Sequence, residues 1–513
     1  MDEDQELPPQ SVPDVGRTPT TTARTRVLIS FTSGAGNTVI VAALGAFAIR
    51  VITLHVTPLE YGNLVTALTF ATTAMIVSDL GITSITGREI ASRPSDAAEI
   101  LGHNLGLRLA LSVLMIPLLN LVSLLAYRQR SGELILAIVI LTIAIPFDAL
   151  RATSLGYYVA TIRTYYGSTI TLIQQVIYVG GVCITIYTGH GIIGCALSYL
   201  VATSISSVLA YSVVRREMSF KPLFNTRQWR IVMRQSISLG AILVVNVLYL
   251  RADIILLGRL VSLQLVGLYG VAYSFITFFS VVPALLGVSL LPLLTRASPE
   301  ELRSLVRRAN HLLAFAGVLF AVGTLLFAPQ AIRALSGVHF SGAATSLRIL
   351  SLATIFTFMN TAYGYAAVAR NRHHRIIVVS VVGLVLNVVL NIIAIPRWGI
   401  TGSAYATLIS EFVALILIRF VYSKDVDAKT SLLASAARPF LVGAVVLVVG
   451  RLLIVPARDA ASELSLLWTP VIALLYVALL ALVRGLPVDL VTLVKSTYER
   501  LARRRNVPTG PAA

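Results

Sequence analysis

The sequence predicts an all-α polytopic membrane protein of about 14 transmembrane helices, in which two parallel six-helix lobes surround a central cavity and two more helices follow. Of the 513 residues, 56% are hydrophobic and 12% are charged, whereas soluble proteins carry about 25% charged residues. The mean hydropathy is +0.84. The apolar residues fall in blocks of roughly 20, which is the length that crosses a bilayer. These observations exclude a soluble globular protein, a disordered chain and a small disulfide scaffold.

Fourteen apolar blocks are each predicted to form one membrane span. Every block is continuous, so each must be a helix that satisfies its own backbone hydrogen bonds in lipid. A closed β-barrel is excluded, because its strands would be about ten residues long and would alternate apolar with polar residues. The blocks are 32–54, 61–85, 104–126, 133–155, 167–187, 191–214, 233–258, 266–291, 309–328, 345–369, 376–395, 400–422, 438–456 and 466–484.

The basic residues predict the orientation of these spans. Arg17, Arg24 and Arg26 precede the first span, which places the N-terminus in the cytoplasm, and an even number of spans places the C-terminus there too. With Arg234, Arg438, Arg451 and Arg484 near the ends of their blocks counted with the adjoining loops, 28 Lys and Arg lie on the inside, 7 lie on the outside and 6 lie within spans. Basic residues are enriched in cytoplasmic loops. The net charge of +18 is therefore explained by membrane topology, and no nucleic-acid partner is predicted.

The spans and the composition between them divide the chain into six segments. They are a disordered cytoplasmic tail at 1–26, an N-lobe at 27–214, a basic cytoplasmic linker at 215–231, a C-lobe at 232–422, a helix pair at 423–484 and a basic cytoplasmic tail at 485–513. The N-terminal tail is acidic and rich in Pro and Thr, and it lacks the basic start and short apolar core of a signal peptide.

The two lobes carry an internal repeat. Gly62 lies at the start of the second span of the N-lobe as Gly267 lies at the start of the second span of the C-lobe, at an offset of 205 residues. Gly194 and Gly402 open the sixth span of each lobe at an offset of 208. Because six is an even number, both repeats enter the membrane from the same side, which gives parallel repeats. Two such lobes favour a transporter, in which the substrate binds between the lobes and access alternates.

Prolines within the predicted spans are expected to bend them. Pro117, Pro146 and Pro283 lie in the third, fourth and eighth spans. Proline removes a backbone donor and its ring clashes with the preceding turn of a helix, so we expect a kink at each position.

Ionisable residues within the spans are the candidate functional residues, because a charge in the bilayer is costly. Those toward the outer ends of spans are Arg50, Arg251, Asp253 and Arg348. Those toward the inner ends are Asp79, Arg108, Asp148 and Arg151. Glu411 lies near the middle of its span, and Arg419 lies close to the inner end of the same span.

Some of these charges have a purely structural interpretation. Arg348 and Arg419 can extend along their aliphatic stems to the membrane interface. Asp148 and Arg151 are three residues apart and share a helix face. They either neutralise each other or contact a substrate, and the sequence leaves both interpretations open.

The other ionisable residues within the spans also have both structural and functional interpretations. Asp79 and Arg108 either pair within the N-lobe or face a cavity. Arg251 and Asp253 are two residues apart, so they point to different faces of their helix. Glu411 is either a proton- or cation-coupling group or a polar contact between helices.

Arginines in both halves of the membrane favour an anionic ligand. A guanidinium stays charged and binds a phosphate through two parallel donors. We therefore predict that Arg50 and Arg251 contact a phosphate or diphosphate in the cavity. The spans hold six Arg and four acidic residues, whereas an exporter of cations would favour carboxylates.

The sequence shows no sign of an enzyme, a cofactor or a metal. It has no Gly-x-x-x-x-Gly-Lys-[Ser/Thr] loop, no Gly-x-Ser-x-Gly and no His-Glu-x-x-His motif. Cys183 and Cys195 both lie in apolar segments, so neither a disulfide nor a metal site is expected. A membrane glycosyltransferase or polymerase is the least favoured class, because even the longest outside loops have only about 15 residues.

Four segments together resemble bacterial polysaccharide (O-antigen-type) flippases. Residues 49–62, IRVITLHVTPLEYG, resemble the "R-x-L-G-P-E-x-Y-G" segment of that family, although His55 and Val56 stand where the family commonly has Leu-Gly. The other segments are DLGI at 79–82 with REIA at 88–91, RADIILLG at 251–258 with VGLY at 266–269, and NVVLNIIAIPRWGITGSA at 387–404. The resemblance covers about residues 27–422 and extends to the superfamily of multidrug, oligosaccharidyl-lipid and polysaccharide exporters.

The resemblance implies a function for the predicted cavity. Such a protein would move undecaprenyl-diphosphate-linked oligosaccharide from the cytoplasmic to the outer leaflet of the bacterial cell membrane, among membrane lipids and polysaccharide assembly proteins. Cavity groups would hold the diphosphate and sugars, and the candidates are Arg50, Arg251, Asp253, Arg108 and Arg151. Coupling to an ion gradient would involve Asp79, Asp148 or Glu411. The alternative is a cation-coupled multidrug extruder of the same superfamily.

Overall fold

The computed structural model describes residues 21–128, 130–370, 373–422, 432–454 and 463–487. Every regular element in these ranges is helical. Most of the predicted tails 1–26 and 485–513 lies outside the described residues. The all-α prediction is therefore confirmed for the part of the chain that the structure describes.

The N-lobe contains eight α-helices and one short 3₁₀ turn. They are α1 (Thr21–His55), α2 (Pro58–Asp79), α3 (Ile82–Ser92), η1 (Pro94–Asp96), α4 (Ala97–Tyr127), α5 (Gly132–Thr142), α6 (Ala144–Ala160), α7 (Thr164–Tyr187) and α8 (Gly191–Glu217).

The C-lobe and the helix pair follow in the same manner. The C-lobe holds α9 (Thr226–Leu260), α10 (Leu263–Phe279), α11 (Val281–Arg296), α12 (Pro299–Ser336), η2 (Val338–Ala343), α13 (Ala344–Ala369) and α14 (His373–Tyr422). The pair consists of α15 (Leu432–Val449), η3 (Gly450–Ile454), η4 (Glu463–Trp468) and α16 (Thr469–Leu482).

Eleven helical segments among the described residues are long and apolar enough to cross a membrane. The longest, Ile376–Val421, contains two predicted spans that meet at Gly399, where φ is +57°. The shorter apolar helix Leu466–Leu482 corresponds to the last predicted span. The chain is therefore a multi-pass membrane protein, as the apolar blocks predict.

Two of the three prolines interrupt their helices where steric arguments place the break. The ring of a proline clashes with the carbonyl of the residue four positions earlier. Accordingly α5 ends at Thr142, four residues before Pro146, and α10 ends at Phe279, four residues before Pro283. The helix α4 instead continues through Pro117.

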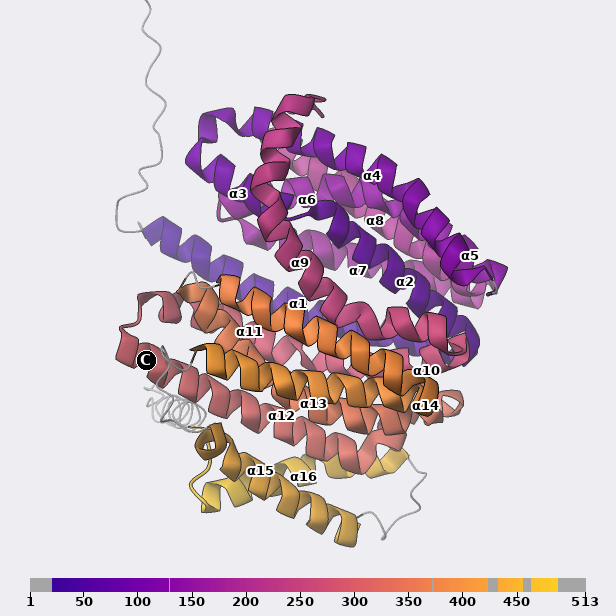
Figure 1. Cartoon of the computed structure of the whole chain (residues 1–513), viewed down its shortest axis with the longest axis vertical. Helices are drawn as coiled ribbons and strands as arrows, with labels where there is room; N and C mark the ends of the chain where they lie inside the picture. Colours follow the sequence, from indigo (N-terminus) through magenta and orange to yellow (C-terminus); the bar gives the residue numbers. More distant parts are fainter. Residues whose placement is uncertain (1–20, 129, 371–372, 423–431, 455–462, 488–513) are drawn as a thin grey trace, which may run out of the picture.

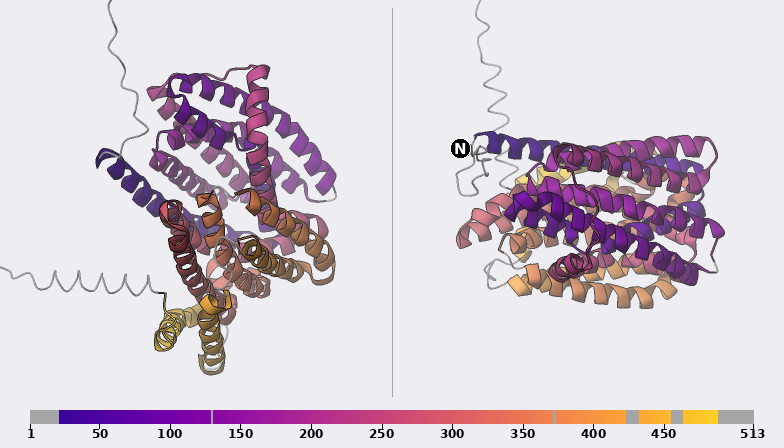
Figure 2. Two further views of the ribbon diagram at one scale, coloured as in Figure 1. Left: turned by 60° about the vertical axis from the view of Figure 1, so that its left-hand side comes forward. Right: turned by 90° about the horizontal axis from the view of Figure 1, so that it is seen from above.

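The helices form two lobes side by side, with the helix pair at the far end of the C-lobe (Figure 1). The long helix α1 lies between the lobes (Figures 1 and 2). Helix α9 also joins them, because it packs against α2, α3 and α4 of the N-lobe and against α14 of the C-lobe. We call the end where α1 and α9 finish and α2 and α10 begin the outer end, following the predicted orientation.

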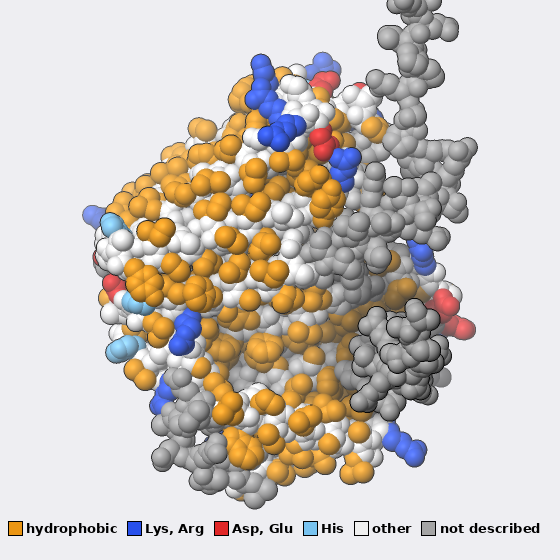
Figure 3. Space-filling model, turned by 180° about the vertical axis from the view of Figure 1, so that it is seen from behind, with side chains coloured by type: hydrophobic (Ala, Val, Ile, Leu, Met, Phe, Trp, Pro, Cys, Tyr) orange, Lys and Arg blue, Asp and Glu red, His pale blue; other side chains and the backbone are white. Residues whose placement is uncertain are grey.

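The exposed surface around the helices is suited to contact with lipid. Large apolar side chains are exposed along α4, including Val113, Leu114, Leu118, Leu121 and Leu125. In the space-filling view hydrophobic side chains cover the middle of the face, and most charged side chains lie at its margins (Figure 3). Extensive apolar exposure of this kind marks a membrane-facing surface.

Candidate functional site

A cavity of about 300 Å³ lies between the two lobes. Four N-lobe helices (α1, α2, α7 and α8) and two C-lobe helices (α9 and α10) contribute its walls. The lining residues are Ile49, Val65, Leu68, Thr69, Thr72, Gln174, Gln175, Tyr178, Tyr199, Arg251, Ile254, Gly270, Tyr273, Ser274, Thr277 and Phe278. The cavity therefore has the interlobe position that the sequence predicts for a substrate site.

The cavity lining combines one charge with neutral polar and aromatic side chains. Among the lining residues Arg251 alone is charged. Gln174 and Gln175 supply side-chain amides, and the Gln174 amide donates to the Thr203 hydroxyl at 3.0 Å. Tyrosines, hydroxyl residues and five apolar side chains complete the wall. Such a lining can bind a ligand that carries an anionic group beside hydroxyl groups, through the guanidinium and the amides respectively.

Capping interactions fix where α2 begins at the outer end. Thr57 is the N-cap residue, and its hydroxyl accepts from the backbone N–H of Glu60 at 3.3 Å. The Glu60 carboxylate in turn accepts from the Thr57 backbone N–H at 2.7 Å. Pro58 occupies the first helical turn, where its missing N–H costs nothing. Ser262, the N-cap of α10, lies 205 residues later, at the repeat offset.

The first turns of α2 and α10 cross in direct backbone contact. A Cβ at Gly62 would overlap the backbone carbonyl oxygen of Leu263, and a Cβ at Gly267 would overlap that of Pro58. Both pairs are related by the 205-residue repeat, so the contact is two-fold pseudosymmetric. We call this contact of Pro58, Gly62, Leu263 and Gly267 the outer crossing. It joins the lobes on the outer side of the cavity.

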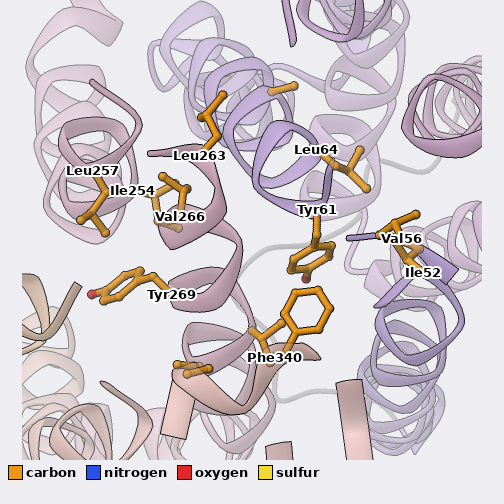
Figure 4. Packing of buried hydrophobic residues seen from close by; sticks show 14 of the residues in the cluster. Ile52, Val56, Tyr61, Leu64, Ile254, Leu257, Leu263, Val266, Tyr269 and Phe340 are labelled. Carbon is orange, nitrogen blue, oxygen red and sulfur yellow. The ribbon is translucent and has the colours of Figure 1, made fainter. Parts of the chain in front are cut away.

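Aromatic packing reinforces the outer crossing. The ring of Tyr61 on α2 meets the ring of Phe340 on η2 edge to face, with centroids 5.7 Å apart. Ile52, Val56 and Leu64 lie near Tyr61, while Val266 and Tyr269 extend the cluster along α10 (Figure 4). Edge-to-face pairs are a favoured aromatic geometry. The two lobes are thus packed together by apolar contacts from both repeats.

The two arginines that were predicted to bind an anion together lie in different surroundings. Arg251 lines the cavity. Arg50 is exposed, and its guanidinium donates to the backbone carbonyl of Ala334 on α12. Its neighbour Ile49 is the α1 residue that lines the cavity. Arg50 therefore joins α1 to the C-lobe, outside the cavity lining.

The C-lobe carboxylates are buried, and neither lines the cavity. Asp253 is 2% exposed and accepts from the Tyr269 hydroxyl at 2.7 Å and from the Thr407 hydroxyl at 3.1 Å. Glu411 is 7% exposed, and it accepts from the Tyr249 hydroxyl and the Asn360 amide, both at 3.0 Å. Both acids are thus held by neutral donors from neighbouring helices.

The N-lobe acids are each bonded to an arginine. Arg108 donates to the carboxylate of Asp79 at 2.6 Å and to the Thr83 hydroxyl at 2.8 Å. Arg151 donates to Asp148 through Nε at 2.9 Å. For both pairs the sequence leaves ion pairing open as one interpretation, and the structure shows that ion pairing. None of these four residues lines the interlobe cavity.

The N-lobe pair on α6 is nevertheless electrostatically linked to the cavity. Tyr199 lines the cavity and interacts electrostatically with Asp148, Arg151 and Arg251. Tyr199 is therefore close to both the N-lobe ion pair and the one lining charge.

Sequence reasoning missed the neutral residues of the cavity. A search for charges selected neither Gln174 and Gln175 nor Tyr178 and Tyr273, all of which line it. The signal was present, because two adjacent glutamines lie inside the apolar block 167–187. A polar pair in a membrane helix faces other helices or a cavity.

Two family models match the chain. The model described as "Polysaccharide biosynthesis protein" matches residues 30–298, and the MatE model matches residues 239–393. The curated relative "Probable flippase AglR" of Haloferax volcanii is 32% identical over 176 residues, which are 33% of this chain. The chain matches 37% of that relative's length.

Solved structures share the fold along most of the chain. The lipid II flippase MurJ in an inward closed conformation has a TM-score of 0.72 at 16% identity and covers 88% of this chain and 98% of its own. An inward-facing multidrug resistance MATE family transporter of the MOP superfamily has a TM-score of 0.58 at 16% identity and covers 79% of this chain and 96% of its own. A MOP superfamily transporter from Pyrococcus furiosus has a TM-score of 0.57 at 14% identity, over 79% of this chain and 96% of its own. These likenesses confirm the two-lobed fold.

Proposed function

Because the chain belongs to the polysaccharide biosynthesis protein family, we propose that it is a flippase. It moves undecaprenyl-diphosphate-linked oligosaccharide from the cytoplasmic to the outer leaflet by alternating access of the two lobes. The observation that carries the proposal is the cavity lining, where one arginine lies among amides, hydroxyls, tyrosines and apolar side chains. The named relative, a probable flippase, supports the same class of activity.

The cavity residues divide the recognition of the substrate between them. The Arg251 guanidinium binds the diphosphate through paired donors. Gln174 and Gln175 exchange hydrogen bonds with sugar hydroxyls, and Tyr178 and Tyr273 offer amphipathic ring surfaces. The cavity of about 300 Å³ is at the lower end of small-molecule sites. An oligosaccharide therefore enters after the lobes separate on the cytoplasmic side, while the outer crossing stays closed.

The buried C-lobe acids are suited to coupling. Asp79 and Asp148 are already neutralised by arginines of their own lobe. The donors to Glu411 are a tyrosine hydroxyl and an amide, which leave its negative charge to be balanced by a proton or a cation. Glu411 is therefore the favoured coupling residue among the three candidates, and Asp253 has the same kind of surroundings.

A multidrug extruder is the second candidate function. The MatE model match over 239–393 and the two buried acids of the C-lobe favour it. The lining of the cavity opposes it, because a cationic drug would meet the guanidinium of Arg251 and no carboxylate.

The proposed location is the cell membrane, with both termini in the cytoplasm. Fourfold more basic residues on the predicted inside than on the outside support this orientation. Polysaccharide assembly proteins are the proposed protein partners, since the cargo comes from and is passed to such enzymes.

Gene deletion with complementation tests the proposed function. Loss of the protein is expected to cause undecaprenyl-diphosphate oligosaccharide to accumulate, as measured by lipid extraction and mass spectrometry. The wild-type gene and Arg397→Ala, a change on an exposed outer residue, should restore the normal pool, whereas Arg251→Ala should not. An unchanged lipid-linked pool in the deletion, together with new sensitivity to cationic dyes, would favour the multidrug extruder.

A further inference from the structure

A second hollow, lined mainly by arginines, lies at the outer end where the lobes meet. Its volume is about 350 Å³, which lies within the range of small-molecule sites. Arg128 and Arg130 reach it from the connection between α4 and α5, and Arg259 reaches it from the last turn of α9. Leu125 and Ala126 complete the lining. We call these five residues the arginine hollow. It is separate from the interlobe cavity, with which it shares no lining residue.

Arg130 already joins the two lobes. Its guanidinium donates to the backbone carbonyl of Val261 at 2.7 Å and to that of Arg259 at 3.3 Å. These carbonyls lie at the C-terminal end of α9, where the helix dipole is negative. The bonds hold the Arg130 side chain in place against the C-lobe, although Arg130 itself belongs to the N-lobe. This contact accounts for one of the three positive charges.

The other two arginines lie at helix C-termini, Arg128 as the C-cap of α4 and Arg259 in the last turn of α9, where the dipole favours a basic residue. Among the described residues, however, neither guanidinium has a hydrogen-bond acceptor like those that hold Arg130. Arg128 and Arg259 are exposed, and among the described residues no acidic side chain forms an ion pair with any arginine of the hollow. Outside loops are normally poor in basic residues, yet three of the seven predicted for the outside meet here. Three like charges in one hollow repel one another, and a bound anion removes that cost.

We propose that the arginine hollow binds a phosphate or diphosphate group at the outer surface of the membrane. Guanidinium groups present forked donors that match phosphate oxygens. The group comes either from the diphosphate of glycan lipid that has reached the outer leaflet or from an anionic phospholipid headgroup. The inference rests on the proposed function and orientation, and it adds an anion site beyond the interlobe cavity.

The arginine hollow also links anion binding to conformation. Its charges come from both lobes, so the complete site exists only while the outer ends of the lobes are together. A ligand that binds one of two states stabilises that state. Anion binding there therefore favours the outer-closed conformation, and a high level of product in the outer leaflet slows the next outward opening.

Binding of inorganic diphosphate to the purified full-length protein tests this site. The protein is placed in nanodiscs of phosphatidylcholine, and the affinity is measured by calorimetric titration. The double variant Arg128→Gln/Arg259→Gln should weaken at least about tenfold the binding step that persists in Arg251→Gln, because it loses two charge-assisted contacts at the hollow. The matched control is Arg397→Gln/Arg451→Gln, which removes two charges from other exposed outer positions and should bind like the wild type.

The outcomes separate the hollow from the interlobe cavity and the two ligand sources from each other. Equal binding by the two double variants, or no binding by the wild type, would overturn the proposal. Binding lost only in Arg251→Gln would also overturn it, while leaving the proposed function intact. Competition by phosphatidylglycerol added to the nanodisc would identify a lipid headgroup as the natural ligand, and absence of competition would identify the glycan-lipid diphosphate. A failure to transport would contradict the proposed function without affecting this binding measurement.

Discussion

A single methyl group at the outer crossing should shift the balance between closed and open conformations. The added Cβ of Gly62→Ala would overlap the carbonyl oxygen of Leu263, and that of Gly267→Ala would overlap the carbonyl oxygen of Pro58. In each case the opposing atom belongs to the backbone of a helix, so relief requires the helices to separate. The outer-open conformation, in which α2 and α10 part, does not carry this clash.

The expected size follows from the cost of overpacking. Extra methyl groups in packed sites cost about 1–3 kcal/mol. A difference of that size changes the ratio of two conformations by about 5- to 150-fold. Because the crossing is pseudosymmetric, the two substitutions should act in the same direction and by similar amounts. The matched control is Gly180→Ala on α7, where a Cβ would meet nothing within 4 Å.

Accessibility from the outside measures this shift. The native Cys183 and Cys195 are replaced by alanine, and Thr69→Cys, which lies in the cavity wall, serves as the reporter. A membrane-impermeant maleimide added from outside should label this cysteine faster in Gly62→Ala and Gly267→Ala than in Gly180→Ala. Equal labelling rates in all three folded variants would refute the assignment of the outer crossing as the closure.

Three further predictions follow from the side-chain networks. The change Arg251→Lys keeps the positive charge but loses the forked guanidinium donors, so it should retain part of the transport of glycan lipid, whereas Arg251→Ala should abolish transport. If both variants were as active as the wild type in a flipping assay, Arg251 would not bind the diphosphate. The change Arg108→Ala should destabilise the protein by about 3–5 kcal/mol, because Arg108 is 2% exposed and its loss leaves Asp79 without its arginine partner. Thermal unfolding should show a much smaller effect for the control Arg163→Ala, because Arg163 and its partner Glu217 are each 33% exposed. Equal effects of the two changes would show that burial of the Arg108 pair does not increase its contribution to stability. The change Glu411→Gln should remove the dependence of transport on an ion gradient, while the affinity for diphosphate stays within about twofold of the wild type. If transport by the variant still depended on the gradient as in the wild type, Glu411 would be excluded as the coupling residue.

Much of the fold can be predicted from the sequence because bilayer physics leaves few alternatives. A continuous apolar block must be a helix, so the spans follow from length and hydropathy. Steric exclusion places the helix breaks before Pro146 and Pro283. The break between α2 and α3 was not predicted. It depends on positive φ at Leu80 and Gly81, and Gly81 there packs against Gly240 of α9. That contact is between distant segments and leaves no local signal.

The candidate site was only partly predictable, because a shift of one position along a helix changes which side chain faces a cavity. Consecutive residues on a helix are separated by about 100°, so Ile49 faces the cavity while Arg50 reaches α12. A search restricted to charges also overlooked Gln174 and Gln175. The sequence does predict the pairing of Asp79 with Arg108 as one of two alternatives, because opposite charges attract each other strongly in a low-dielectric environment.

Translocation by the purified protein in proteoliposomes tests the central claim most directly. Undecaprenyl-diphosphate-linked oligosaccharide is distributed over both leaflets, and a glycan-cleaving enzyme added outside reports the exposed fraction. The account predicts that glycan lipid protected in protein-free vesicles becomes cleavable when the wild-type protein is present, and that it stays protected with Arg251→Ala. A protected fraction that the wild-type protein leaves unchanged, in vesicles where it moves a cationic dye, would contradict the account.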